Sequence, residues 1–331
     1  MLACPMTDVI PTEAVAGERI GAAPRARVAR RHRRFRPGAA RRADIAWGYL
    51  FLLPAIAFLG VFLVEPFVKA AQYSLESWDG IGPARYVGLD NYKRLWTDPV
   101  ERSSLVHLGI LFCFYSLIPT AAGLAAAAIV RRANRRGMGV FRVIFFLPQV
   151  IVTVVAAIVW TWILAPSGPA TLNGILHALG LGPAVGRPWL GDFNTALIAV
   201  GLIAVWLDFG LCFVLFLAGV QRIAPDIYDA ARIDGAGLGR EFFLITVPLL
   251  RREIGAALTI SVVAALQSFT LIYQATNGGP GTATMVPGLL VYRQGFQLGE
   301  VGAASALGIA MTFLIFGLTL GIRALIERNA T

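Results

Sequence analysis

Several polar side chains stand inside long apolar stretches of this sequence. Asp208, Gln267 and Tyr115 are the clearest cases, and Ser268 and Ser116 stand beside two of them. Because polar groups are costly in hydrocarbon, such side chains face other protein groups or a path for a solute. Two interpretations stay open for each residue: a hydrogen bond to a hydroxyl of a passing solute, or a hydrogen bond to a neighbouring helix.

The charges in the same stretches narrow the class of solute. None of the apolar stretches contains Lys or Arg, and Asp208 is their only acidic residue. A binding site without cations disfavours an anionic solute and suits a neutral, polyhydroxylated one, unless a partner chain supplies the cations.

Residues that usually perform catalysis or bind metal are scattered along the chain. The three histidines (His32, His107, His177) and the three cysteines (Cys4, Cys113, Cys212) show no ligand spacing. A site for ATP hydrolysis needs a Gly-rich loop that ends in Gly-Lys-Ser or Gly-Lys-Thr, and the only lysines, Lys69 and Lys93, have no such context. We therefore expect no enzyme activity, no metal site and no cofactor bound by this chain itself.

The elements that position the polar residues are predicted to be membrane helices. Hydrophobic residues make up 57% of the 331 residues and charged ones only 15%, a balance typical of a chain in lipid. About 20 apolar residues are needed to cross a bilayer as a helix. Six stretches meet this length within a few residues and predict an all-α, multi-pass integral membrane protein, with spans at 45–64, 105–130, 143–165, 196–220, 254–275 and 302–322.

The distribution of basic residues predicts the orientation of these spans. With both termini inside, the cytoplasmic segments hold 22 of the 29 Lys and Arg residues and the outer loops hold 7. Positive flanks are retained on the cytoplasmic side, so the pattern favours an N-in/C-in topology.

Residues 1–44 are rich in Arg, Ala, Gly and Pro without apolar periodicity, which predicts a disordered cytoplasmic tail. The net charge of +10 suggests nucleic-acid binding as an alternative, but an Arg-rich tail before a first span fixes orientation and contacts anionic lipid. We expect membrane lipid and no nucleic acid as its partner. A signal peptide is a poorer interpretation, because the first stretch is long and five more follow.

The inner loop between the fourth and fifth spans, residues 221–253, carries the most specific pattern. Pro225 and Asp226 suit a helix start, and a short helix is predicted to end near Ile233, before Asp234-Gly235. The chain then resumes as helix from about Arg240 to Thr246. Ile227, Ala230 and Ala231 share one face of the short helix, which suits docking in the groove of a partner.

This loop resembles the EAA loop of bacterial import permeases. That pattern is Glu-Ala-Ala, three residues, Gly, nine residues, Ile, one residue and Leu-Pro. The sequence matches it with Asp229, Ala230, Ala231, Gly235, Ile245 and Pro248, and departs from it in Asp229 for Glu and Val247 for Leu. Flanking segments resemble the sugar branch of these permeases, similar to maltose and glycerol-phosphate importers: Phe145 to Pro148, Asn173, Asp234-Gly235-Ala236, Thr276 to Gly281 and Tyr292 to Phe296. The resemblance covers residues 45–327.

The resemblance implies a permease subunit of an ATP-driven, binding-protein-dependent importer in the bacterial inner membrane. The implied partners are a dimer of ATP-binding cassettes that brings ATP and Mg, a second and different permease chain, and an extracytoplasmic solute-binding protein. The implied coupling residues are Asp229, Ala230, Ala231, Asp234, Gly235, Ala236 and Pro248.

Two other classes remain as alternatives. An ion-gradient-driven secondary carrier would show more intramembrane carboxylates or an inverted repeat with broken helices. An integral membrane enzyme would require clustered His, Asp or Glu near one interface, and the acidic residues here are scattered.

Overall fold

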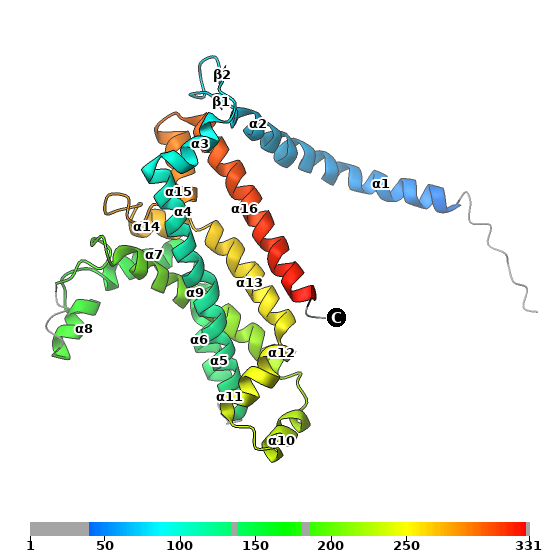
Figure 1. The fold of residues 1–331 in the computed structure, drawn as a ribbon, viewed down its shortest axis with the longest axis vertical. Helices are drawn as coiled ribbons and strands as arrows, with labels where there is room; N and C mark the ends of the chain where they lie inside the picture. Colours follow the sequence, from blue (N-terminus) through cyan, green and yellow to red (C-terminus); the bar gives the residue numbers. More distant parts are fainter. Residues whose placement is uncertain (1–39, 134–137, 181–185, 329–331) are drawn as a thin grey trace, which may run out of the picture. The chain divides into compact units, whose positions relative to one another are not determined.

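A computed structural model describes residues 40–133, 138–180 and 186–328 (Figure 1). The chain divides into two units, residues 1–58 and 59–331. The first contains most of helix α1, which begins at Ala40, inside the last residues of the predicted disordered tail. Ala and Arg are strong helix formers, which accounts for this earlier start. The rest of the predicted tail lies outside the described residues.

Helices make up almost all of the regular structure in the described ranges. Their order with the two short strands is α1 (Ala40–Leu59), η1 (Gly60–Val64), α2 (Glu65–Tyr73), β1 (Glu76–Ser77), β2 (Arg85–Tyr86), α3 (Asp90–Thr97), α4 (Pro99–Phe112), η2 (Cys113–Leu117), α5 (Ile118–Ala133), α6 (Met138–Val150), α7 (Thr153–Ile163), α8 (Leu172–Ala178), α9 (Ala196–Val220), α10 (Pro225–Ile233), α11 (Leu238–Arg240), η4 (Glu241–Thr246), α12 (Val247–Leu249), α13 (Arg251–Leu266), α14 (Thr270–Ala275), α15 (Pro287–Tyr292), η5 (Arg293–Gln297) and α16 (Val301–Arg328). The segments labelled η are short π-helical turns, and β1 pairs antiparallel with β2.

Four described helices are long and apolar enough to cross a bilayer. They cover Tyr49–Tyr73, Pro99–Arg131, Ala196–Val220 and Val301–Leu325. These correspond to the first, second, fourth and sixth predicted spans. The first helix runs past the predicted end at residue 64, and Lys69 pairs with Glu65 one turn earlier at 2.7 Å.

The segments predicted as the third and fifth spans are broken rather than continuous helices, and in the described residues only the pair α6–α7 is long and apolar enough to count as one further, bent span. In the third, α6 and α7 meet at an angle of 99°, next to Pro148, which lacks an N–H and disturbs the helical ladder. In the fifth, α13 ends at Leu266 and α14 starts at Thr270. The turn between them replaces the regular helical bonds, because Ser268 N–H donates to the Ala265 carbonyl oxygen and Phe269 N–H to that of Gln267.

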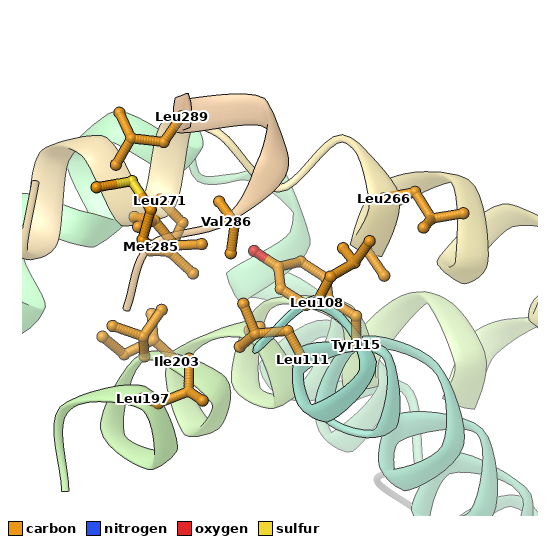
Figure 2. Packing of buried hydrophobic residues seen from close by; sticks show 14 of the residues in the cluster. Leu108, Leu111, Tyr115, Leu197, Ile203, Leu266, Leu271, Met285, Val286 and Leu289 are labelled. Carbon is orange, nitrogen blue, oxygen red and sulfur yellow. The ribbon is translucent and has the colours of Figure 1, made fainter. Parts of the chain in front are cut away.

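The core of the second unit joins segments that are far apart in sequence. One cluster of buried residues comes from α3, α4, η2, α7, α9, α13, α14, α15 with the loop before it, and α16. Figure 2 shows part of it, with Leu111 and Tyr115 near Val286 and with Leu197 and Ile203 on α9. A second cluster, centred on Phe213 and Phe216, joins α5 and the C-terminal half of α9 to the first turns of α13. The central helix α9 takes part in both.

Large apolar side chains are exposed along several of the long helices. Phe51 of α1 and Phe313 of α16 are examples, and the apolar part of the first helix buries none of its residues in the protein. Exposed apolar side chains in this number are unfavourable in water and suit contact with lipid or with other membrane helices.

Candidate functional site

A cavity of about 280 Å³ lies among the broken helices and α9. It brings together the three residues that the sequence singled out: Tyr115 on η2, Asp208 in the middle of α9 and Gln267 at the end of α13. The cavity is also lined by Gln149, Ile151, Thr153, Leu207, Ala264, Ser268, Thr270 and Leu271. Three residues from three separate apolar stretches therefore converge on one space.

The irregular backbone of this region delivers the polar side chains. Gln149 and Thr153 flank the break between α6 and α7, and Gln267 and Ser268 form the break between α13 and α14. Tyr115 lies on a π-helical turn, a distortion that is frequent at functional sites. Irregular backbone at membrane depth is tolerated where it lines a cavity, and the residues at both breaks line one here.

Gln149 was not predicted from the sequence, since it lies within the long apolar stretch 143–165. Its position directly after Pro148 is the feature that could have identified it, because a proline inside a helix disturbs the helical hydrogen bonds and favours a bend. Ser116, in contrast, is fully buried away from the cavity and lies 3.4 Å from the hydroxyl of Ser261. That contact is a bond between neighbouring helices, one of the two interpretations left open for it.

The loop between α9 and α13 contains the second candidate site. Helix α10 covers Pro225–Ile233, as the sequence predicted, and stops in a Schellman motif. Ala236 N–H donates to the Ala231 carbonyl oxygen at 2.9 Å, and Gly235 N–H to that of Arg232 at 3.0 Å. Gly235 has a φ of +77°, a left-handed conformation that favours glycine. The Asp234-Gly235-Ala236 sequence therefore builds the end of the helix.

One side of α10 is fixed to the rest of the unit. The Tyr228 ring is buried, its hydroxyl lies 2.9 Å from Thr246 Oγ1, and the guanidinium of Arg131 on α5 lies 3.3 Å from the ring centre. Arg232 pairs with the buried Glu241 at 2.9 Å and with Asp229 at 3.1 Å. These contacts connect α10 to η4 and α5.

The opposite side of α10 and the turn after it are open. Ile227, Asp229, Ala230, Asp234 and Gly235 are exposed, whereas Ala231 and Ala236 are partly covered. Ile233 exposes 87% of its surface, which is unusual for an isoleucine in a monomer. The exposed Pro248 belongs to α12, the turn that leads to α13. All predicted coupling residues except Pro248 thus lie on one short segment with an uncovered face.

The loop between α7 and α9 is organised by Asn173. Its side-chain amide donates to the carbonyl oxygens of Arg187 at 2.9 Å and Pro166 at 3.0 Å, and its Oδ1 accepts from Trp189 Nε1 at 2.9 Å. One buried side chain therefore holds both sides of this loop. The loop after α14 opens with the predicted turn, in which Gly279 N–H donates to the Thr276 carbonyl oxygen at 2.9 Å.

Fold and site define a class: a multi-pass helical membrane protein with a polar cavity between its helices and an uncovered helix in a connecting loop, as in membrane permeases. The chain belongs to the family described as binding-protein-dependent transport system inner membrane component, whose family profile matches residues 120–330. It is a non-catalytic, integral inner-membrane permease component.

Two curated relatives and one solved structure are similar to this chain. A probable ABC transporter permease protein, YurN of Bacillus subtilis, is 34% identical and covers 82% of this chain and 93% of its own length. The trehalose/maltose transport system permease protein MalF of Thermococcus litoralis is 34% identical, with 82% and 91% covered. A bacterial alginate ABC transporter, solved in complex with an alginate pentasaccharide-bound periplasmic protein, has the same fold, with a TM-score of 0.71, 22% identity, and 88% and 97% of the two chains covered.

Proposed function

We propose that this chain is the permease subunit of an ATP-driven importer for a carbohydrate, with six spans and both termini in the cytoplasm. The third and fifth spans are the broken pairs α6–α7 and α13–α14. The 22 basic residues in the inner segments support this topology. It places the loop with α10 in the cytoplasm.

The geometry of α10 is the observation that carries the proposal. It offers Ile227 and Ala230 to a partner on one face and is bound through Tyr228 and Arg232 on the other. A dimer of ATP-binding cassettes would hold Asp229, Ala230, Ala231, Asp234, Gly235, Ala236 and Pro248. When the cassettes close on ATP, α10 would move as a lever and switch the helices between two arrangements, driven by the difference in ATP binding between them.

The remaining partners follow from the relatives and the outer loops. The relative named for trehalose and maltose transport supports a sugar as the solute. The alginate transporter was solved with a periplasmic protein, which supports a solute-binding protein docking on the outer loops here. ATP and Mg would be bound by the cassettes alone, and a second, different permease chain completes the path. Nothing among the relatives supports the ion-gradient carrier.

The test is co-purification of the detergent-solubilised chain with the ATP-binding protein encoded beside it. Gly235→Asp places a charge and a strained backbone on the face that would dock. Gly180→Asp is a matched control, because Gly180 also has a left-handed φ (+76°) and open space around it, but lies in the second outer loop. We expect wild type and Gly180→Asp to retain the ATPase and Gly235→Asp to lose most of it.

Two results would contradict the proposal. A well-folded wild-type chain that binds no ATPase would overturn the importer function and favour a gradient-driven carrier. Equal retention by Gly235→Asp and wild type would show that the ATPase docks elsewhere than on this loop.

A further inference from the structure

A groove of about 420 Å³ lies between the end of α5 and the segment that holds α10. One wall comes from α5 and the other from α10, α11 and η4. Tyr228, which fixes α10 to the unit, lines the groove, whereas the exposed Ile227 does not. The groove is therefore separate from the uncovered face of α10. Its volume falls within the roughly 300–1,000 Å³ of small-ligand pockets.

The groove lies where two membrane helices end. Gly201 of α9 lies against the Phe114 ring, and Gly123 of α5 lies against Cys212 further along α9, so the two helices run parallel. Eight residues beyond the second contact, both apolar helices end, one at Arg131 and the other at Val220. Two spans that end side by side mark a boundary of the bilayer, and α10 lies just beyond it.

Arg131 is the uncompensated charge of the groove. Its guanidinium carbon lies 3.3 Å from the centre of the Tyr228 ring, a cation–π contact, and among the described residues it has no carboxylate partner. The other charged lining residues in the described ranges, Arg232 and Glu241, pair with each other at 2.9 Å. The lining thus has one excess positive charge. The ring covers one face of the Arg131 guanidinium and leaves N–H groups at its edge for an anion such as phosphate.

The rest of the lining is mostly apolar. Ala125, Ala128 and Ile129 come from the membrane helix, and Leu238 and Phe242 come from the segment beyond it. Ile129 exposes 69% of its surface and Leu238 exposes 65%, so both offer apolar area to a ligand. A complementary ligand joins an apolar chain to a negative group. An anionic phospholipid has both parts and is present at this depth, whereas a soluble anion would leave the apolar wall uncovered.

We propose that this groove is a binding site for one anionic phospholipid, with its phosphate on Arg131 and an acyl chain along α5. Because Arg131 also stacks on Tyr228, the bound lipid stabilises the attachment of α10 to the end of the membrane helix. The proposal goes beyond the import function. It requires that α5 spans the bilayer and is independent of the solute that is carried.

The test is native mass spectrometry of the full chain, purified with the subunits that it retains and titrated with phosphatidylglycerol or with phosphatidylcholine of the same acyl chains. Arg131→Gln removes the charge, and Arg131→Lys keeps it. Arg142→Gln is the matched control, because Arg142 is an exposed arginine of α6 that lies outside the groove. A further arm adds inorganic phosphate in place of the anionic lipid, which separates a lipid site from a site for a free anion.

In wild type and Arg142→Gln we expect one phosphatidylglycerol molecule that binds about fivefold more tightly than phosphatidylcholine, the preference that one surface arginine provides. Arg131→Gln should lose this preference, and Arg131→Lys should keep most of it. Phosphatidylglycerol should also raise the unfolding temperature of wild type above its value in phosphatidylcholine, and leave that of Arg131→Gln unchanged.

Three results would overturn the proposal. They are an equal preference in wild type and Arg131→Gln, an equal stabilisation by inorganic phosphate, and a wild-type complex without a tightly bound lipid because another chain covers the groove. None of them bears on the import function, which the co-purification of the ATPase decides.

Discussion

The hydroxyl of Tyr228 on α10 lies 2.9 Å from Thr246 Oγ1 on η4, and both side chains are buried. The contact joins the short exposed helix to the segment that leads through α12 into α13. Gln267 and Ser268, at the far end of α13, line the polar cavity. One continuous chain segment thus connects the uncovered loop to the cavity and offers a physical route for coupling between them.

Removing the two partners of this contact should have unequal effects. Thr246→Val leaves the buried Tyr228 hydroxyl without a partner, which costs about 1–3 kcal/mol of folding free energy. Tyr228→Phe costs less, about 0.5–1.5 kcal/mol, because the Thr246 hydroxyl still donates to the Glu241 carbonyl oxygen at 3.2 Å. Thermal unfolding of the purified chain should rank wild type above Tyr228→Phe and Tyr228→Phe above Thr246→Val.

The double variant serves as the control for this prediction. Tyr228→Phe in the Thr246→Val background removes the unpaired hydroxyl and should recover part of the lost stability. Equal losses in the two single variants, or further loss in the double variant, would mean that the hydroxyl contact does not stabilise α10.

Gly235 and Gly237 provide a matched pair for the end of α10. A methyl group at either position meets no atom within 4 Å, but Gly235 has a φ of +77° and Gly237 a φ of −77°. Gly235→Ala should therefore lose roughly 1–2 kcal/mol through backbone strain alone, whereas Gly237→Ala should be neutral or slightly stabilising. The lower unfolding temperature and weaker ATPase retention should appear in Gly235→Ala only. Similar behaviour of both variants would show that the left-handed turn is dispensable.

Local signals along the chain were sufficient to predict α10 and α9. Pro225 and Gly235 delimit α10, and α9 matches its apolar stretch, residues 196–220, because nothing in that stretch interrupts the helix. The breaks in α6–α7 and α13–α14 were not predicted. An apolar run looks continuous whether or not its backbone bends, and the bend at Gln267 depends on what α13 packs against.

The sequence predicted three residues of the candidate cavity, but it did not predict that they come together in one space. Asp208, Gln267 and Tyr115 stand out as polar residues in apolar surroundings, but their convergence depends on how three spans pack. Hydropathy carries no information on that packing, because lipid and the protein interior are similarly apolar. Gln149 could be recognised as a cavity residue only once the bend after Pro148 was known.

Asn173 is predicted to be essential for the shape of the loop between α7 and α9. Asn173→Asp keeps the acceptor for Trp189 but removes the donors to the carbonyl oxygens of Pro166 and Arg187, and places a buried negative charge against them. Loss of these bonds with burial of a charge should cost about 2–4 kcal/mol locally. Limited proteolysis should cut the loop faster in Asn173→Asp than in wild type. Asn194→Asp, at an exposed position of the same loop, is the control and should leave the cleavage rate unchanged.

Adjacent basic residues on α3 should differ in their effect on stability. Arg94 lies 3.0 Å from the buried carboxylate of Glu101, which also accepts from Gln294 Nε2 at 2.8 Å, so this group joins α3 and α4 to η5. Arg94→Ala would leave Glu101 with the amide alone. Because the Arg94 side chain is 38% exposed, solvent screening reduces the loss to about 1–3 kcal/mol. Lys93→Ala breaks only an exposed pair with Asp90 and should change stability by less than about 0.5 kcal/mol.

Adding Glu101→Gln to Arg94→Ala should restore part of the unfolding temperature, since it removes the uncompensated charge. If Arg94→Ala unfolds like Lys93→Ala, the buried carboxylate is held by other groups and the connection between α3, α4 and η5 does not depend on Arg94.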